Sequence, residues 1–116
     1  MVLWHTEEDT PHSPYMVHAG EPVAIWVGTH PIEHGQYVRL EWRITNSDGG
    51  LTEGGAEAYW HFNDYGRGSS YWLATFGPFT AGDTVEYVIV GQSKDGEIFS
   101  RKHEFVVEES KTYAEQ

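Results

Sequence analysis

Hydrophobic and polar residues alternate along most of this chain with the two-residue period of β-strands. The clearest case is residues 37–45, whose core-facing side is expected to carry Val38, Leu40, Trp42 and Ile44. Further strands are predicted over residues 15–18, 23–27, 56–62, 71–76, 84–90 and 99–107. Residues 28–35 and 51–55, which contain four glycines, are expected to form a loop and an irregular segment.

Turn residues between these segments indicate antiparallel neighbours. Ser93–Gly96 ends in Asp-Gly, which supplies the positive-φ positions of a tight hairpin. Asp83, Val85 and Tyr87 have the spacing of a tyrosine corner, and Trp42 has the place of a central sandwich tryptophan. The pattern predicts an all-β, immunoglobulin-like antiparallel β-sandwich of about seven strands. It would span residues 15–107, after an extended arm (1–14) and before a polar tail or linker (108–116).

Composition narrows the partners that such a domain would have. Seven basic and eighteen acidic residues give a formal charge of −11, which disfavours nucleic acid and anionic membranes as partners. The absence of cysteine excludes disulfides and thiolate metal sites. No cofactor is expected. The start of the chain lacks a signal-peptide pattern, so we expect a cytoplasmic location.

Eight of the seventeen aromatic residues fall between positions 59 and 79. Sugars stack their C–H faces on such rings and hydrogen-bond to amide, carboxylate and guanidinium groups. The candidate carbohydrate contacts are Tyr59, Trp60, Asn63, Asp64, Tyr65, Arg67, Tyr71 and Trp72. Alternate rings must be core, so Phe76 and either Trp60 or Trp72 are expected to be buried. We expect Tyr65 and Trp72 to be the exposed rings.

The loop around His30, Glu33 and His34 is a weaker candidate for metal binding, because imidazole and carboxylate are zinc or iron ligands. The segment resembles the His-Pro-x-Glu motif of superoxide reductases. Gln36 replaces a further histidine of that motif, and the required thiolate is missing, so that activity is excluded. An exposed polar loop is the simpler interpretation.

Paired carboxylates are a third candidate chemistry. Glu53 and Glu57 flank a glycine pair, and Asp64 lies in the aromatic segment. Glycosidases hold two carboxyl groups about 5–10 Å apart across a cleft, and a small sandwich offers little room for one. Catalysis by this chain alone is therefore not expected.

The sequence resembles the N-terminal immunoglobulin-like modules of bacterial α-amylase-family (family 13-type) glycoside hydrolases. The resemblance covers residues 13–107 and rests on Ser13–Tyr15, Ala19–Val23, Tyr71–Phe76 and Gly82–Ile89. It implies a non-catalytic accessory module that contacts an α-glucan oligosaccharide weakly or packs on a catalytic barrel of the same polypeptide. A stand-alone protein-interaction sandwich is the alternative.

Overall fold

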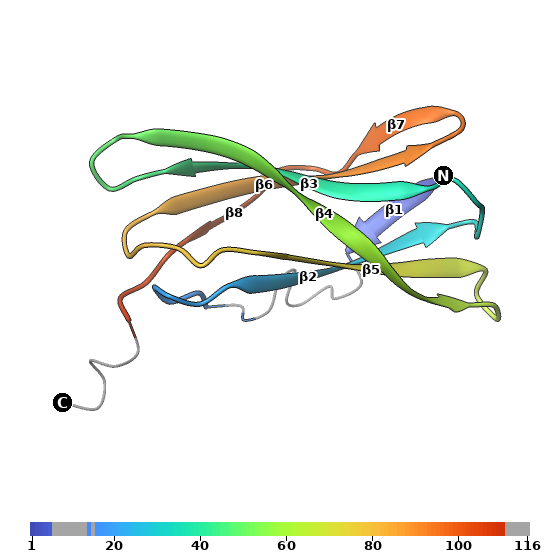
Figure 1. The fold of residues 1–116 in the computed structure, drawn as a ribbon, viewed down its shortest axis with the longest axis horizontal. Helices are drawn as coiled ribbons and strands as arrows, with labels where there is room; N and C mark the ends of the chain where they lie inside the picture. The colour runs from blue at the N-terminus through green and yellow to red at the C-terminus, as the bar shows by residue number, and fades with distance from the viewer. Residues whose placement is uncertain (6–13, 15, 111–116) are drawn as a thin grey trace.

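A computed structural model describes residues 1–5, 14 and 16–110 (Figure 1). In these residues the chain forms eight strands, all paired antiparallel, and no helix. The strands are β1 (Val2–His5), β2 (Val23–His30), β3 (Tyr37–Thr45), β4 (Leu51–Asp64), β5 (Ser69–Phe76), β6 (Thr84–Ser93), β7 (Gly96–Phe99) and β8 (His103–Val106). No helix long and apolar enough to cross a membrane is found in these residues.

The strand order is β1-β2-β5-β4-β3-β6-β7, and β8 pairs with the start of β6. This is the order of an immunoglobulin sandwich, in which strands one, two, five and four form one sheet and strands three, six and seven form the other. β7 and β8 pair with opposite ends of β6, so together they occupy the place of the seventh strand. The predicted all-β sandwich is confirmed as a nearly closed, barrel-like sandwich.

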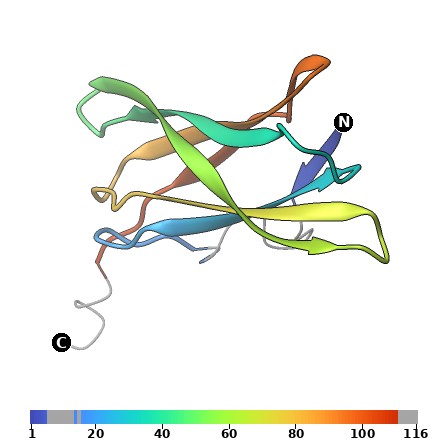
Figure 2. The ribbon, with the colours of Figure 1, turned by 45° about the vertical axis from the view of Figure 1, so that its right-hand side comes forward.

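β4 joins the two layers because it changes partners along its 14 residues. Its first half pairs with β3 and its second half with β5, and Ala58 pairs with both Val38 and Ala74. The strand therefore crosses diagonally from one layer to the other, as Figures 1 and 2 show. We call β1, β2, β5 and the second half of β4 the aromatic layer. The first half of β4 with β3, β6, β7 and β8 is the charged layer.

A β-bulge at His61 changes the orientation of the end of β4. The register shifts between Trp60, which pairs with Trp72, and Phe62, which pairs with Tyr71. Because one extra residue moves all later side chains to the opposite face, Phe62 lies on the outer face of its layer beside Tyr71. Strict alternation over the strand predicted at 56–62 would put Trp60 and Phe62 on one side, and it is wrong at this point.

The core lies between the two layers and is apolar. Both layers contribute fully buried side chains, among them Ile25, Val27, Leu40, Ala74, Tyr87 and Ile89. The Tyr87 ring stacks on His103 with centroids 5.1 Å apart, and burial raises the pKa of its hydroxyl above the usual range. Phe76 is buried, as expected, and packs on Phe79 and Tyr87.

Trp42 faces the core as predicted but is only half-buried. Its ring stacks on Phe76, with centroids 6.4 Å apart, and fills the space where a Cβ on Gly54 would lie. Beyond this point the β3–β4 hairpin is exposed except for Ile44, which is half-buried against the core. Residues 51–55, which were predicted to be irregular, are part of β4. Glycine is needed at position 54 because the Trp42 indole ring lies where a Cβ would be.

Four further features differ from the sequence prediction. Residues 28–30 extend β2 instead of opening a loop, and the final predicted strand is split into β7 and β8. Val2–His5, expected in an extended arm, pairs with β2, and the Trp4 ring lies over Gly28. The strand expected at residues 15–18 is reduced to one bridge between His18 and Glu108, and residue 15 lies outside the described residues. The division at residues 14/15 and 107/108 stays a prediction.

Candidate functional site

A groove opens where β4 leaves β3. After the shared pairing at Ala58, β4 turns toward β5, so the start of β3 has no neighbour on that side. Two hollows of about 370 and 500 Å³ lie in this gap and have Gln36, Trp60 and Trp72 in common. We call them together the groove. Their size falls within the range of small-ligand sites.

The two tryptophans of the groove differ in exposure although their backbones pair directly. Trp72 is 8% exposed, and its indole N–H donates to Thr29 Oγ1 at 3.0 Å. Trp60 is 55% exposed, and its indole N–H donates to Asn63 Oδ1 at 2.9 Å. The prediction that one of the two is buried is confirmed. The expectation that Trp72 is the exposed one is wrong, since its partner Thr29 lies inside the sandwich.

Asn63 fixes the position of the Trp60 ring. Its side-chain oxygen also accepts a 2.7 Å hydrogen bond from Ser70 Oγ, and its amide donates to the Tyr65 hydroxyl at 3.3 Å. The exposed indole is therefore held in one orientation before any ligand arrives. A fixed ring loses little conformational entropy on stacking, which favours binding.

The loop that follows β2 forms the opposite wall of the groove. Gln36 is buried, accepts from Thr29 Oγ1 at 3.4 Å and donates to the Pro31 carbonyl at 2.9 Å. These bonds tie the loop to the aromatic layer and place Glu33 and His34 at the groove. Glu33 lies 3.6 Å from Lys94 Nζ in an exposed ion pair.

The structure brings together only part of the predicted carbohydrate site. Trp60, Asn63 and Trp72 line the groove, Tyr59 lies at its border, and Tyr65 joins it through Asn63. Asp64 and Arg67 instead pair with each other at 3.8 Å, away from these hollows. Tyr71 lies on the outer face, stacked on Phe62 with centroids 4.8 Å apart.

The loop residues considered for metal are also separated by the fold. Glu33 and His34 line the groove, whereas the His30 ring lies near Gly68. Among the described residues no group of three His, Asp or Glu side chains is placed to hold a metal ion.

Sequence reasoning missed Gln36, Tyr37 and Gln92, which also line the groove. Tyr37 is 67% exposed and provides a second open ring there. Its only sequence signal was its position at the exposed start of a strand. Gln36 was considered only because it occupies the position of a histidine in the superoxide reductase motif. The residues next to it in the sequence do not indicate that it is buried.

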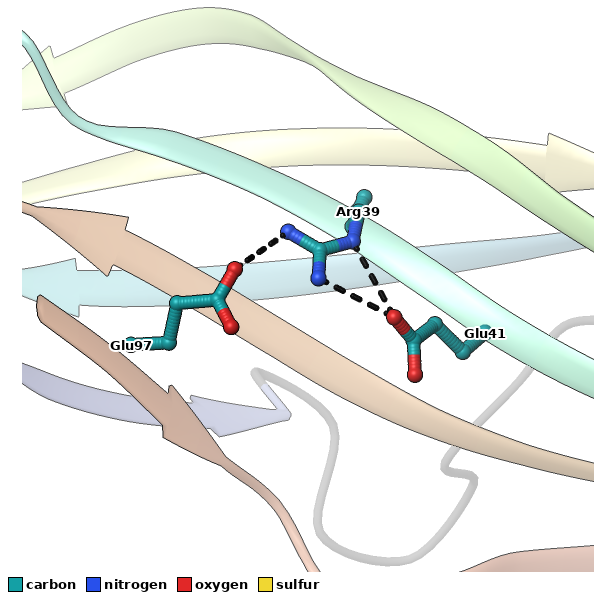
Figure 3. A network of polar contacts seen from close by, with 3 residues as sticks. All are labelled: Arg39, Glu41 and Glu97. Atoms are coloured by element: carbon teal, nitrogen blue, oxygen red, sulfur yellow. Dashed lines mark hydrogen bonds and ion pairs between the residues drawn. The ribbon is translucent and has the colours of Figure 1, made fainter.

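A further hollow of about 580 Å³ lies on the outer face of the charged layer. Its lining includes Arg39, Arg43, Glu53, Glu86 and Lys102. Arg39 bridges Glu41 and Glu97 (Figure 3) with an N–O distance of 3.0 Å to each, and these bonds raise its pKa above the usual range. The lining charges are already paired with one another, and no aromatic ring comparable to Trp60 is open there.

The chain is similar to a small part of larger glycan-processing enzymes. It is 33% identical over 87 residues to an isomaltosyltransferase from Sporosarcina globispora, a match that covers 75% of this chain and 7% of that enzyme. No family model matches the chain.

Two solved Listeria monocytogenes structures share the fold, each with a TM-score of 0.77, 29% identity and coverage of 92% of this chain but 10% of theirs. One is a cycloalternan-forming enzyme in complex with a pentasaccharide substrate. The other is an uncharacterized protein solved with α-D-glucose, β-D-glucose, magnesium and calcium. The resemblance to a small accessory β-domain of glycoside hydrolases is confirmed, and the chain spans about a tenth or less of these relatives.

Proposed function

We propose that this chain, the counterpart of a small β-sandwich domain within larger glycan-processing enzymes, is a non-catalytic accessory module that contacts α-glucan through the groove. The observation that carries the proposal is the Trp60 ring. It is more than half exposed, yet its indole N–H is held by Asn63 inside a hollow of ligand size. A fixed, open indole is what a sugar ring needs for stacking.

The polar lining of the groove suits a neutral, hydroxyl-rich ligand. Glu33, His34 and Gln92 offer donors and acceptors around the open rings of Trp60 and Tyr37. One or two stacked rings provide roughly the 4 kcal/mol that a millimolar site requires. The affinity should therefore be weak, as suits a module that keeps a glucan near another domain without trapping it.

A catalytic domain of the same polypeptide is the second proposed partner. The relatives are enzymes, and this chain matches only 7–10% of their length. The groove would then hold a glucan chain while a separate domain performs the chemistry. Among the described residues no metal-binding group is assembled. Two carboxylates, Glu33 and Glu57, line the groove, and Glu33 is paired with Lys94.

Isothermal titration of the chain with maltooligosaccharides tests the proposal. We expect saturable, millimolar binding that Trp60→Ala abolishes, because the stacking ring is removed. Phe99→Ala is the matched control, since Phe99 is an aromatic residue that is 60% exposed but not part of the groove lining. It should weaken binding far less. Absence of binding at high sugar concentration, or equal loss in both variants, would contradict the proposal.

A further inference from the structure

The groove consists of two hollows whose linings differ. The smaller hollow, of about 370 Å³, is lined mainly by residues 32–36 of the loop that follows β2, and we call it the loop hollow. The larger hollow, of about 500 Å³, is lined mainly by residues 37–39 of β3 and residues 57–59 of β4, and we call it the strand hollow. Each hollow therefore offers a ligand its own set of contacts.

Trp60 is the open side chain that the two hollows share. Three side chains border both hollows, namely Gln36, Trp60 and Trp72. Gln36 and Trp72 are buried and form a common floor, whereas Trp60 is more than half exposed. The floor is fixed, because Trp72 Nε1 donates to Thr29 Oγ1, which in turn donates to Gln36 Oε1. A ligand can therefore contact the Trp60 ring from either hollow.

The strand hollow has open rings and a carboxylate of its own. Tyr37 is 67% exposed and Tyr59 is 69% exposed, and both line the strand hollow but not the loop hollow. Glu57 also lines the strand hollow, and its exposed carboxylate forms no ion pair within the described part of the chain. An ionised carboxylate accepts hydrogen bonds from hydroxyl groups. The strand hollow thus provides what a sugar unit needs, which is a ring for stacking and acceptors for its hydroxyls.

We infer that the groove binds two consecutive units of one sugar chain, one in each hollow, with the Trp60 ring in contact with both. The inference rests on the proposed function and adds the length of sugar chain that the site recognises. Each hollow alone reaches the size of a small-ligand site, for which the lower limit is about 300 Å³. One monosaccharide would therefore occupy a single hollow and leave the contacts of the other hollow unused.

Linking two sugar units should increase the affinity sharply. A ligand loses translational and rotational freedom when it binds, and two linked units lose this freedom only once. Contacts in the second hollow therefore add to those in the first hollow without a second loss of the same kind. A third unit would extend beyond both hollows, so it should add little to the affinity.

Chemical-shift titrations of the nitrogen-15-labelled chain with glucose, maltose and maltotriose test this inference. We expect maltose to bind about tenfold or more tightly than glucose, and maltotriose to bind within about threefold of maltose. Tyr37→Ala should remove the gain, so that maltose binds about as weakly as glucose. Trp60→Ala should weaken the binding of every sugar, because its ring borders both hollows. Phe99→Ala removes a similarly exposed ring outside the groove and should leave all three affinities unchanged.

The outcomes separate this inference from the proposed function. If maltose binds no more tightly than glucose, or if Tyr37→Ala keeps the gain, the strand hollow is not a second subsite, while weak glucan binding stands. A gain that repeats in full from maltose to maltotriose would likewise overturn the two-unit site. If none of the three sugars binds, the proposed function itself fails, and this inference fails with it. Circular dichroism checks the folding of each variant, which changes at exposed positions should not disturb.

Discussion

The two outer faces of the sandwich share strand geometry and solvent access but differ in side-chain chemistry. On the charged layer, Arg39 pairs with Glu41 and Glu97, and Arg43 pairs with Glu53. On the aromatic layer, the corresponding positions carry rings that pack on one another. Ion pairs of the first kind keep a surface hydrated and contribute little stability. A surface of packed rings presents apolar carbon instead, so the two outer faces differ in how well water hydrates them.

The groove lies where the two layers separate, and it takes features from both. Trp60 comes from the aromatic layer, whereas Tyr37 and Gln92 come from the charged layer. Stacking rings and hydrogen-bonding groups are thus combined along this seam. β4 creates this seam by changing its partner from β3 to β5, so the path of one strand determines where the groove lies.

The largest predicted effect compares one inner tryptophan from each layer. Trp72→Ala should destabilise the fold by about 3–5 kcal/mol, because it leaves a buried cavity and removes the donor to Thr29. Trp42→Ala should cost about 2 kcal/mol, because that ring is only half-buried. Urea unfolding of the two variants measures both values. A larger loss for Trp42→Ala would show that the charged layer holds the more important ring.

A smaller effect compares the outer faces directly. Tyr71→Ala should cost about 1–3 kcal/mol, because Tyr71 contacts both Trp4 and Phe62. Arg43→Ala should cost less than about 1 kcal/mol, since its ion pair with Glu53 is exposed. Thermal unfolding at low and high salt gives both numbers. If the arginine variant proves the less stable of the two, the charged face is structurally more important than we propose.

Much of the fold could be predicted because it depends on local alternation. The facing of Val38, Leu40, Trp42 and Ile44 follows from period two alone, and the structure agrees. The strand through Gly54 could not be predicted, because glycine normally disfavours strands. Only the position of the Trp42 ring, twelve residues earlier, explains why a side chain is absent there.

The site was harder to predict because it depends on long-range pairing. Trp60 and Trp72 look alike in sequence, and only the pairing of β5 with β2 places Thr29 within reach of Trp72. The outer face of the aromatic layer is formed by residues from four strands, and the bulge at His61 places Phe62 on that face. No spacing along the chain records that bulge. The groove likewise appears only once β4 is known to change partners at Ala58.

The five tryptophans provide the most direct test, because they sample each region of the molecule. In a nitrogen-15 spectrum each indole N–H gives its own signal. Trp4 and Trp26 report on the outer face of the aromatic layer, Trp42 reports on the β3–β4 hairpin, and Trp60 and Trp72 report on the groove. Titration with maltooligosaccharide at low protein concentration should shift the Trp60 signal most and the Trp72 signal less. Signals from Trp4 and Trp26 should stay in place. Sugar-dependent shifts centred on Trp26 instead, with Trp60 unmoved, would contradict the assignment of the groove as the glucan site.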